Sequence, residues 1–247
     1  MFELKLGKFL ADAGIASRRR CKDLVLSGSV SINGRIAESS GMLIDPENDV
    51  IEVEGKRVSY DPDAKKIYIL LNKLPGYLSA TADSHGVPTI MDLLPHSDER
   101  LFPVGRLDKD TEGLLIVTND GDLTYHLTHP KHHVDKVYLA YVEGTPTEES
   151  LDKLRQGIML DCGMTAPAVV ERESYNRNDK TDSKNTCLKI TIHEGKKRQI
   201  KRMCAAIGHK VLRLKRIQLA QITLGDLRPG EYRYLTQEEV ESLKKCV

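Results

Sequence analysis

The chain has no tryptophan and only three phenylalanines among its 247 residues, so its core is expected to consist mainly of leucine, isoleucine and valine. Its five cysteines include no Cys-x-x-Cys pair, which argues against a disulfide framework and a cysteine zinc site. No apolar run approaches the roughly 18 residues of a membrane-spanning helix, and the charged N-terminal segment is unlike a signal peptide. We therefore expect a cytoplasmic protein that does not contact membranes.

Motifs for nucleotide and metal chemistry are also missing. The sequence contains neither a P-loop nor a Gly-x-Gly-x-x-Gly turn, so no cofactor is implied. His126, His129, His132 and His133 crowd into one segment, but they lack a regular helical spacing and a cysteine partner. Loop histidines are the simpler interpretation, and no bound metal is expected.

The net charge of +1 conceals an uneven distribution of charge. Residues 185–216 contain ten lysines and arginines against one acid, Glu194, and a second basic cluster lies in residues 5–35. Basic side chains at phosphate spacing bind nucleic acid with salt-dependent affinity. The sequence therefore favours an RNA-binding protein, with solvated basic helix faces as the alternative.

The length of the chain favours two domains, because one domain commonly has about 100–150 residues. The polar, proline-containing stretch 61–66 precedes an apolar run and reads as a linker. The expected domains are therefore residues 1–60 and 67–247. Short helices and strands without regular β-α-β alternation indicate the α+β class.

The N-terminal segment has a helix face at Leu6, Phe9 and Leu10 and a cap for a second helix at Ser17. Asn33-Gly34 indicates a hairpin. Three arginines after Ser17 oppose the helix macrodipole, a cost that phosphate binding would offset. This pattern resembles the S4 RNA-binding module, although a small αβ domain with a solvated basic face is the alternative. The RNA contacts that the resemblance implies are Lys8, Ser17, Arg18, Arg19 and Lys22.

The most informative segment is residues 104–121, VGRLDKDTEGLLIVTNDG. It places Asp108 on a loop directly before the apolar run 114–117, which is bounded by turn residues and reads as a core strand. Loops held by such strands often carry function. A structural turn, in which Arg106 pairs with Asp108 or Asp110, is the alternative.

Further elements follow from periodicity. Residues 136–144 alternate like a strand, with Tyr138 on one face, and residues 186–193 read as another strand. A polar turn is expected over 174–183. Apolar residues spaced as a helix face over 200–207 place Arg198, Lys201 and Arg202 on the opposite, polar face.

The Gly-Arg-Leu-Asp sequence around Asp108, with the Gly-Leu-Leu and Thr-Asn-Asp-Gly that follow it, resembles the catalytic signature of pseudouridine synthases of the RsuA/RluB type. Asn72-Lys73 resembles the opening of their catalytic domain, although Leu74 stands where the family usually has proline. The resemblance implies a mixed, mainly antiparallel sheet and isomerisation of uridine in RNA. It also implies that Asp108 is the essential aspartate, that Tyr138 packs on the target base, and that Lys201 pairs with the aspartate.

The chemistry of such an isomerisation suits these residue types. The N1–C1′ bond breaks and C5 takes its place, which requires a carboxylate near the ribose as nucleophile or base, and the sequence leaves both roles open. The target uridine has to leave its stack to reach these groups. The further RNA contacts expected in this domain are Arg106, Arg198, Arg202, Arg213 and Arg216.

The sequence of residues 208–216 and 222–227 resembles that of the large-subunit branch of the family. It implies an enzyme that acts on 23S rRNA, free or in a large-subunit assembly intermediate. A monomer is the default expectation, and the sequence leaves the oligomeric state open. A 16S rRNA pseudouridine synthase and a non-catalytic S4-type RNA-binding or ribosome-assembly factor are the alternatives.

Overall fold

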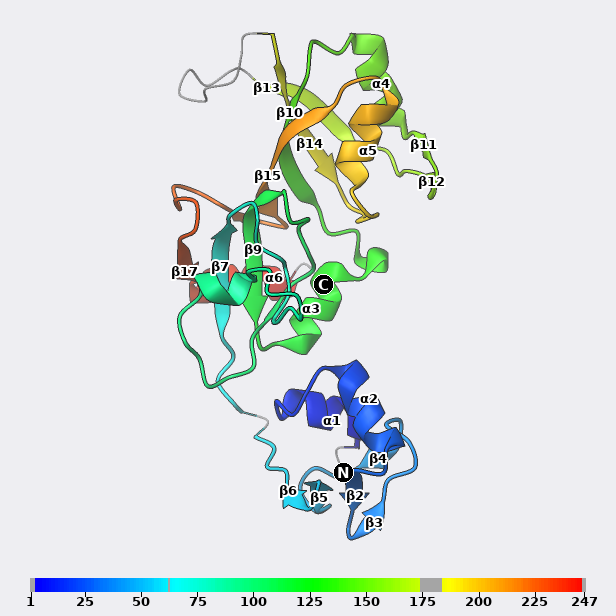
Figure 1. Ribbon diagram of the computed structural model, residues 1–247, viewed down its shortest axis with the longest axis vertical. Helices are drawn as coiled ribbons and strands as arrows, with labels where there is room; N and C mark the ends of the chain where they lie inside the picture. The colour runs from blue at the N-terminus through cyan, green and yellow to red at the C-terminus, as the bar shows by residue number, and fades with distance from the viewer. Residues whose placement is uncertain (1–2, 62, 174–183, 246–247) are drawn as a thin grey trace. The chain divides into compact units, whose positions relative to one another are not determined.

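The computed structural model describes residues 3–61, 63–173 and 184–245 (Figure 1). The chain divides into two compact units, residues 1–66 with 97–100, and residues 67–96 with 101–247. Each unit has its own hydrophobic core. The polar turn expected over 174–183 lies outside the described residues.

The first unit packs two helices against short strands, and the predicted helix face at Leu6, Phe9 and Leu10 is buried. The Ser17 hydroxyl oxygen accepts a hydrogen bond from the Arg20 backbone N–H (3.3 Å), which confirms the predicted cap. The elements are β1 (Leu4–Lys5), α1 (Leu6–Asp12), α2 (Arg18–Leu26), β2 (Val30–Ile32), β3 (Arg35–Ile36), β4 (Leu43–Ile44), β5 (Ile51–Val53) and β6 (Lys56–Arg57).

The strands of this unit form a four-stranded sheet in the order β3-β2-β5-β6 and a separate β1-β4 pair. The predicted hairpin joins β2 to β3. Asn33 and Gly34 have φ angles of 49° and 79°, as required at the two central residues of a type I′ turn.

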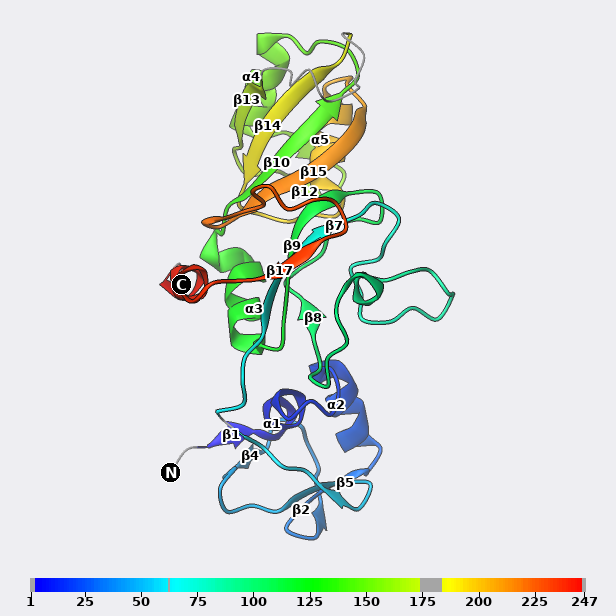
Figure 2. The ribbon, with the colours of Figure 1, turned by 90° about the vertical axis from the view of Figure 1, so that its left-hand side faces the viewer.

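The second unit is built on a nine-stranded sheet in the order β13-β14-β10-β15-β9-β7-β17, with β16 beside β15 and β8 beside β9 (Figures 1 and 2). Its described strands pair antiparallel except for β9 and β15, so the prediction of a mixed, mainly antiparallel sheet is confirmed. The strands are β7 (Tyr68–Lys73), β8 (Phe102–Pro103), β9 (Glu112–Thr118), β10 (Lys136–Val142), β13 (Val169–Glu173), β14 (Thr186–Ile192), β15 (Val211–Leu219), β16 (Ile222–Thr223) and β17 (Tyr232–Tyr234).

Helices cover parts of this sheet. Figure 1 shows α4 and α5 beside β10 and β14, and Figure 2 shows α3 beside β7 and β9. Helix α6 contributes Leu243 to a core shared with Leu70 of β7 and Leu114 of β9. Among the described residues, no helix is long and apolar enough to span a membrane. The remaining elements are η1 (Ile90–Leu93), α3 (Gly121–Thr128), η2 (Pro130–His132), α4 (Glu148–Gln156), β11 (Met159–Leu160), β12 (Gly163–Met164), α5 (Gln199–Ala206) and α6 (Gln237–Lys245).

Strand β9 is buried on both faces, which explains its continuous apolar run. Leu115 and Val117 belong to the core shared with α4 and α5, and Leu114 and Ile116 belong to the core shared with α3 and α6. This doubly covered strand is the rigid support from which the Asp108 loop emerges.

Candidate active site

A cleft of about 640 Å³ opens in the second unit beside the Asp108 loop. Residues of β10, β14 and β15 line it, together with the segment that leads into α5. It therefore combines an acidic side chain, an aromatic ring and several cations. The lining residues used below are Arg106, Asp108, Lys109, Thr111, Lys136, Tyr138, Ile192, Lys196, Lys197, Arg198, Gln199, Leu214 and Arg216.

Lys73, at the end of β7, holds the backbone of the Asp108 loop. Its side chain is fully buried, and Nζ donates to the carbonyl oxygens of Leu74 and Thr111 (2.9 Å each) and of Asp108 and Lys109 (3.3 Å each). Burial lowers the pKa of the Lys73 ammonium to about 8. Sequence reasoning gave this lysine no role, and its only signal there was its place in the Asn-Lys pair.

The loop is fixed at two further points. The Ser79 hydroxyl accepts from the backbone N–H of Leu107 (3.1 Å) and lies 2.9 Å from its carbonyl oxygen. The Thr111 N–H donates to the Asp108 carbonyl oxygen (3.0 Å) and closes a tight turn. These bonds position the half-buried Asp108 side chain at the cleft.

Gly113 brings the loop end against β15. It pairs with Arg216 in the parallel ladder, has a φ of 105°, and a Cβ at this position would overlap the Arg216 backbone. Glycine alone allows both this conformation and this close approach.

Lys201 pairs with Asp110, and the predicted pairing of Lys201 with Asp108 is wrong. The Lys201 Nζ lies 2.5 Å from Asp110 Oδ1, and Arg198 Nη1 lies 3.6 Å from Asp110 Oδ2. The tight turn after Asp108 directs the more exposed Asp110 toward the first turn of α5. Burial by itself would raise the pKa of the Asp110 carboxyl, but Lys201 and Arg198 outweigh that effect and hold the pKa below its ordinary value.

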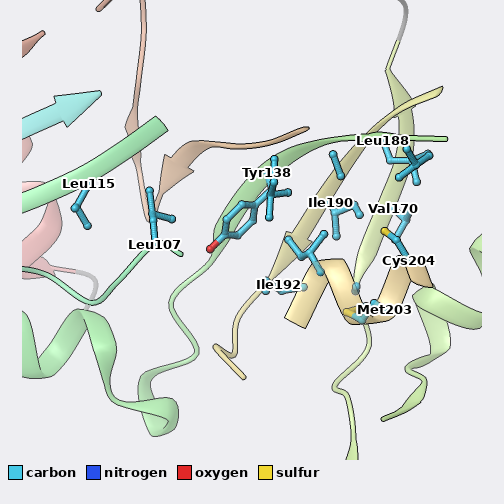
Figure 3. Close-up of a cluster of buried hydrophobic side chains, with 14 of the residues drawn as sticks. Leu107, Leu115, Tyr138, Val170, Leu188, Ile190, Ile192, Met203 and Cys204 are labelled. Atoms are coloured by element: carbon cyan, nitrogen blue, oxygen red, sulfur yellow. The ribbon is translucent and has the colours of Figure 1, made fainter. Parts of the chain in front are cut away.

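Tyr138 supplies an aromatic ring in the cleft wall. Its side chain is 9% exposed, and Figure 3 shows its ring between Leu107 and Ile192, with the hydroxyl oxygen on the side of Leu107. The residue lies opposite Ile190 on β14 and Arg216 on β15. A ring in this position is available for stacking on a planar group inside the cleft.

The predicted RNA contacts of this unit do not form one exposed track. Arg106 and Arg198 are exposed, whereas Arg202 pairs with Asp161. Arg213 pairs with Glu112 (Nε–Oε1 2.6 Å). Arg216 is only 2% exposed, so it does not lie with the exposed cations of this unit. The reason is that residues 211–219 form β15, in which successive side chains point to opposite faces.

The predicted contacts of the first unit lie on or near its helices. Arg18, Arg19 and Lys22 are exposed on α2, whereas the Lys8 Nζ lies 3.8 Å from Asp12 Oδ2 and Ser17 caps the helix. The exposed side chains of α2 therefore present a basic face.

Sequence reasoning also missed Gln199, which is 4% exposed at the start of α5. Its amide nitrogen donates to Glu194 Oε1 (2.6 Å), and its amide oxygen accepts from the Lys196 backbone N–H (3.0 Å). These bonds fix the basic segment that lines the cleft. The Arg-Gln pair before an apolar helix face was the available signal.

The histidine segment forms an aromatic cluster in the structure. His126, His129 and His132 lie around Tyr125, with 4.9 Å between the ring centroids of Tyr125 and His129. Within the described part of the chain, no group of three or more histidine, cysteine or acidic side chains could hold a metal ion.

Comparisons with known proteins agree with this architecture. The RNA pseudouridylate synthase family model matches residues 67–206, and the S4 domain model matches residues 4–51. An uncharacterized RNA pseudouridine synthase of Aquifex aeolicus (strain VF5) is 46% identical over 248 residues, covering 100% of this chain and 96% of that protein.

Two further matches cover nearly the whole chain. Ribosomal large subunit pseudouridine synthase B of Bacillus subtilis (strain 168) is 41% identical over 240 residues, covering 97% of this chain and 95% of that protein. A crystal structure of a pseudouridylate synthase superposes with a TM-score of 0.67 at 35% identity, covering 97% of this chain and 99% of that one.

Together, the fold, the cleft and these matches define an RNA-modifying isomerase with an RNA-binding domain. The chain belongs to the RNA pseudouridine synthase family and is of the RsuA/RluB type.

Proposed function

We propose that the protein isomerises a specific uridine of large-subunit 23S rRNA, free or in an assembly intermediate, with Asp108 as the catalytic carboxylate. The observation that carries the proposal is the anchoring of the Asp108 backbone by buried Lys73 beside a cleft lined by Tyr138. The large-subunit target is supported by 41% identity to a Bacillus subtilis enzyme that bears that name.

The reaction follows from the groups that line the cleft. The target uridine leaves its helix and enters the cleft, where stacking on Tyr138 contributes roughly 1–3 kcal/mol. The N1–C1′ bond breaks, a C5–C1′ bond forms, and the proton lost from C5 is balanced by one gained at N1. Asp108 serves this exchange at the ribose, as nucleophile at C1′ or as base, and no external redox or group-transfer reagent is required.

In this proposal Lys201 acts as a positioning residue. Its ion pair with Asp110 joins α5 to the Asp108 loop, and Arg198 reinforces it.

Exposed cations supply the affinity for RNA. Arg18, Arg19 and Lys22 offer phosphate contacts on the first unit, and Arg106 and Arg198 offer them at the cleft. Because such contacts release counterions, RNA affinity falls steeply with salt concentration.

The test measures tritium release from 5-tritiated uridine in 23S and 16S rRNA transcripts and in large-subunit precursor particles. Asp108→Asn is expected to abolish release while filter binding of the RNA is unchanged. Asp226→Asn, at an exposed aspartate of the same unit, is the matched control and retains release. Preference for 16S rRNA would overturn the large-subunit target, and binding without release from any substrate would favour a non-catalytic RNA-binding factor.

A further inference from the structure

Arg216 lines the cleft, and one nitrogen of its guanidinium, Nη2, is buried without a hydrogen-bond partner among the described residues. Nε donates to the Leu114 carbonyl oxygen (2.7 Å), which fixes the side chain. A buried, unpaired N–H of a charged group is costly, which suggests that its partner arrives with the substrate.

Arg216 and Tyr138 share one face of the sheet. They are cross-strand partners in the antiparallel β10-β15 ladder, and side chains directly opposite each other in such a ladder project to the same side. Both line the cleft, together with the apolar side chains of Ile192 and Leu214. A planar group stacked on Tyr138 would therefore lie on the same face of the sheet as the guanidinium.

Neighbouring charged groups have other partners. Lys136 donates to the carbonyl oxygens of Val134 (2.6 Å) and His193 (3.4 Å), and burial and the nearby Arg216 lower its pKa to about 8. Glu112 pairs with Arg213. Among the lining residues, Asp108 is the acidic group that Arg216 could pair with instead of a substrate.

The burial of Arg216 indicates that it contacts a base of the RNA and not a backbone phosphate. A backbone phosphate meets exposed cations such as Arg106, Lys197 and Arg198, which line the same cleft. Arg216 is 2% exposed, so a group has to enter the cleft to reach it. Uracil has apolar faces suited to Tyr138 and two carbonyl oxygens at its edges that accept hydrogen bonds.

We propose that Arg216 donates a hydrogen bond from Nη2 to a carbonyl oxygen of the extruded uracil while the ring stacks on Tyr138. The inference rests on the proposed function and adds a base-contacting residue to it. This contact matters most after the N1–C1′ bond breaks, because the detached uracil has to stay in the cleft and present C5 to C1′.

The test uses the full-length protein with Arg216→Met and Arg216→Lys. Arg216→Lys keeps the charge and loses the planar, forked donor set. Arg228→Met, at an exposed arginine of the same unit, controls for loss of one positive charge. Release of tritium from 5-tritiated 23S rRNA is measured at saturating enzyme in a single turnover, beside RNA affinity at several salt concentrations.

Both Arg216 variants are expected to release tritium about 10- to 100-fold more slowly, the size expected for loss of one charged hydrogen bond. Their RNA affinity and its salt dependence remain those of the wild type. A weaker affinity with a shallower salt dependence, at an unchanged single-turnover rate, would show a phosphate contact and overturn the proposal.

Two other outcomes would also overturn it. A shift of the acidic limb of the pH–rate profile would show that Arg216 pairs with Asp108. The Arg216 variants could also melt at a lower temperature than the wild type. If they then release tritium at the wild-type rate whenever they are assayed below that melting temperature, Arg216 has a role in folding alone. If wild-type enzyme releases no tritium from any rRNA, the proposed function fails with the inference, whereas an active wild type with unimpaired variants refutes the inference alone.

Discussion

The Lys73 ammonium lies 3.3 Å from the backbone carbonyl oxygen of Asp108. The lysine comes from the end of β7 and the aspartate from a loop 35 residues later, so the contact joins two parts of the chain that are distant in the sequence. The Asp108 side chain remains available to substrate because the lysine binds its main chain.

Lys73→Met is expected to lower the free energy of unfolding by about 1–3 kcal/mol, because buried carbonyl oxygens lose their donor. Tritium release is expected to fall sharply, whereas RNA affinity stays close to that of the wild type. Denaturant unfolding, tritium release and filter binding measure the three effects. Lys66→Met, at an exposed lysine, is the control, and unchanged release by Lys73→Met would contradict a positioning role.

Gly113→Ala tests the approach of the loop end to β15. The positive φ and the overlap of a Cβ with the Arg216 backbone together are expected to cost about 2–4 kcal/mol of unfolding free energy. Gly163→Ala is the matched control, because Gly163 has a similar φ of 101° and no heavy atom within 4 Å of its added Cβ. Equal losses in the two variants would show that backbone strain alone explains the effect.

The pair of Asp110 with Lys201 predicts a pH dependence. The pKa of the folded Asp110 carboxyl lies below its ordinary value of 3.8. The pair therefore stabilises the fold fully above about pH 3.8, and this contribution is lost as the pH falls through the folded pKa. Since Asp110 is largely exposed, the contribution is expected to stay below about 1 kcal/mol.

Urea unfolding of wild type and Asp110→Asn between pH 2 and pH 7, at roughly constant ionic strength, measures this contribution. The difference between the two proteins is expected to vanish at the acidic end. A constant difference over the whole range would refute the assignment of the effect to the ionised carboxylate.

The elements that sequence reasoning predicted are those with local signals. The apolar run at 114–117 predicts β9, alternation predicts β10, and the periodicity over 200–207 predicts α5, because each pattern reports burial of that segment. The burial of Arg216 could not be predicted, because it depends on pairing of β15 with β9, a strand about 100 residues earlier. The sequence around a basic residue in a strand does not show whether that residue is buried or exposed.

The role of Lys73 could not be predicted from the sequence for the same reason, because it depends on contacts with a distant part of the chain. A lysine after an apolar strand predicts an exposed side chain at a strand end, and only the return of the Asp108 loop supplies the carbonyl oxygens that bind it. The pairing of Lys201 with Asp110 likewise depends on how the turn after Asp108 directs two nearby carboxylates.

The basic face of α2 predicts a separable contribution to RNA binding. In the double variant Arg18→Ala, Arg19→Ala, the slope of log affinity against log salt is expected to be about two units shallower, if each arginine neutralises one phosphate. Single-turnover tritium release at saturating enzyme is expected to stay unchanged, because neither side chain lines the cleft of the second unit.

A matched double variant, Lys56→Ala with Arg57→Ala, removes the same charge from exposed positions on β6. It separates specific phosphate contacts from a general loss of positive potential. An equal change of slope in both double variants would refute the assignment to α2, because a diffuse electrostatic field responds to the net charge and not to the position of the arginines.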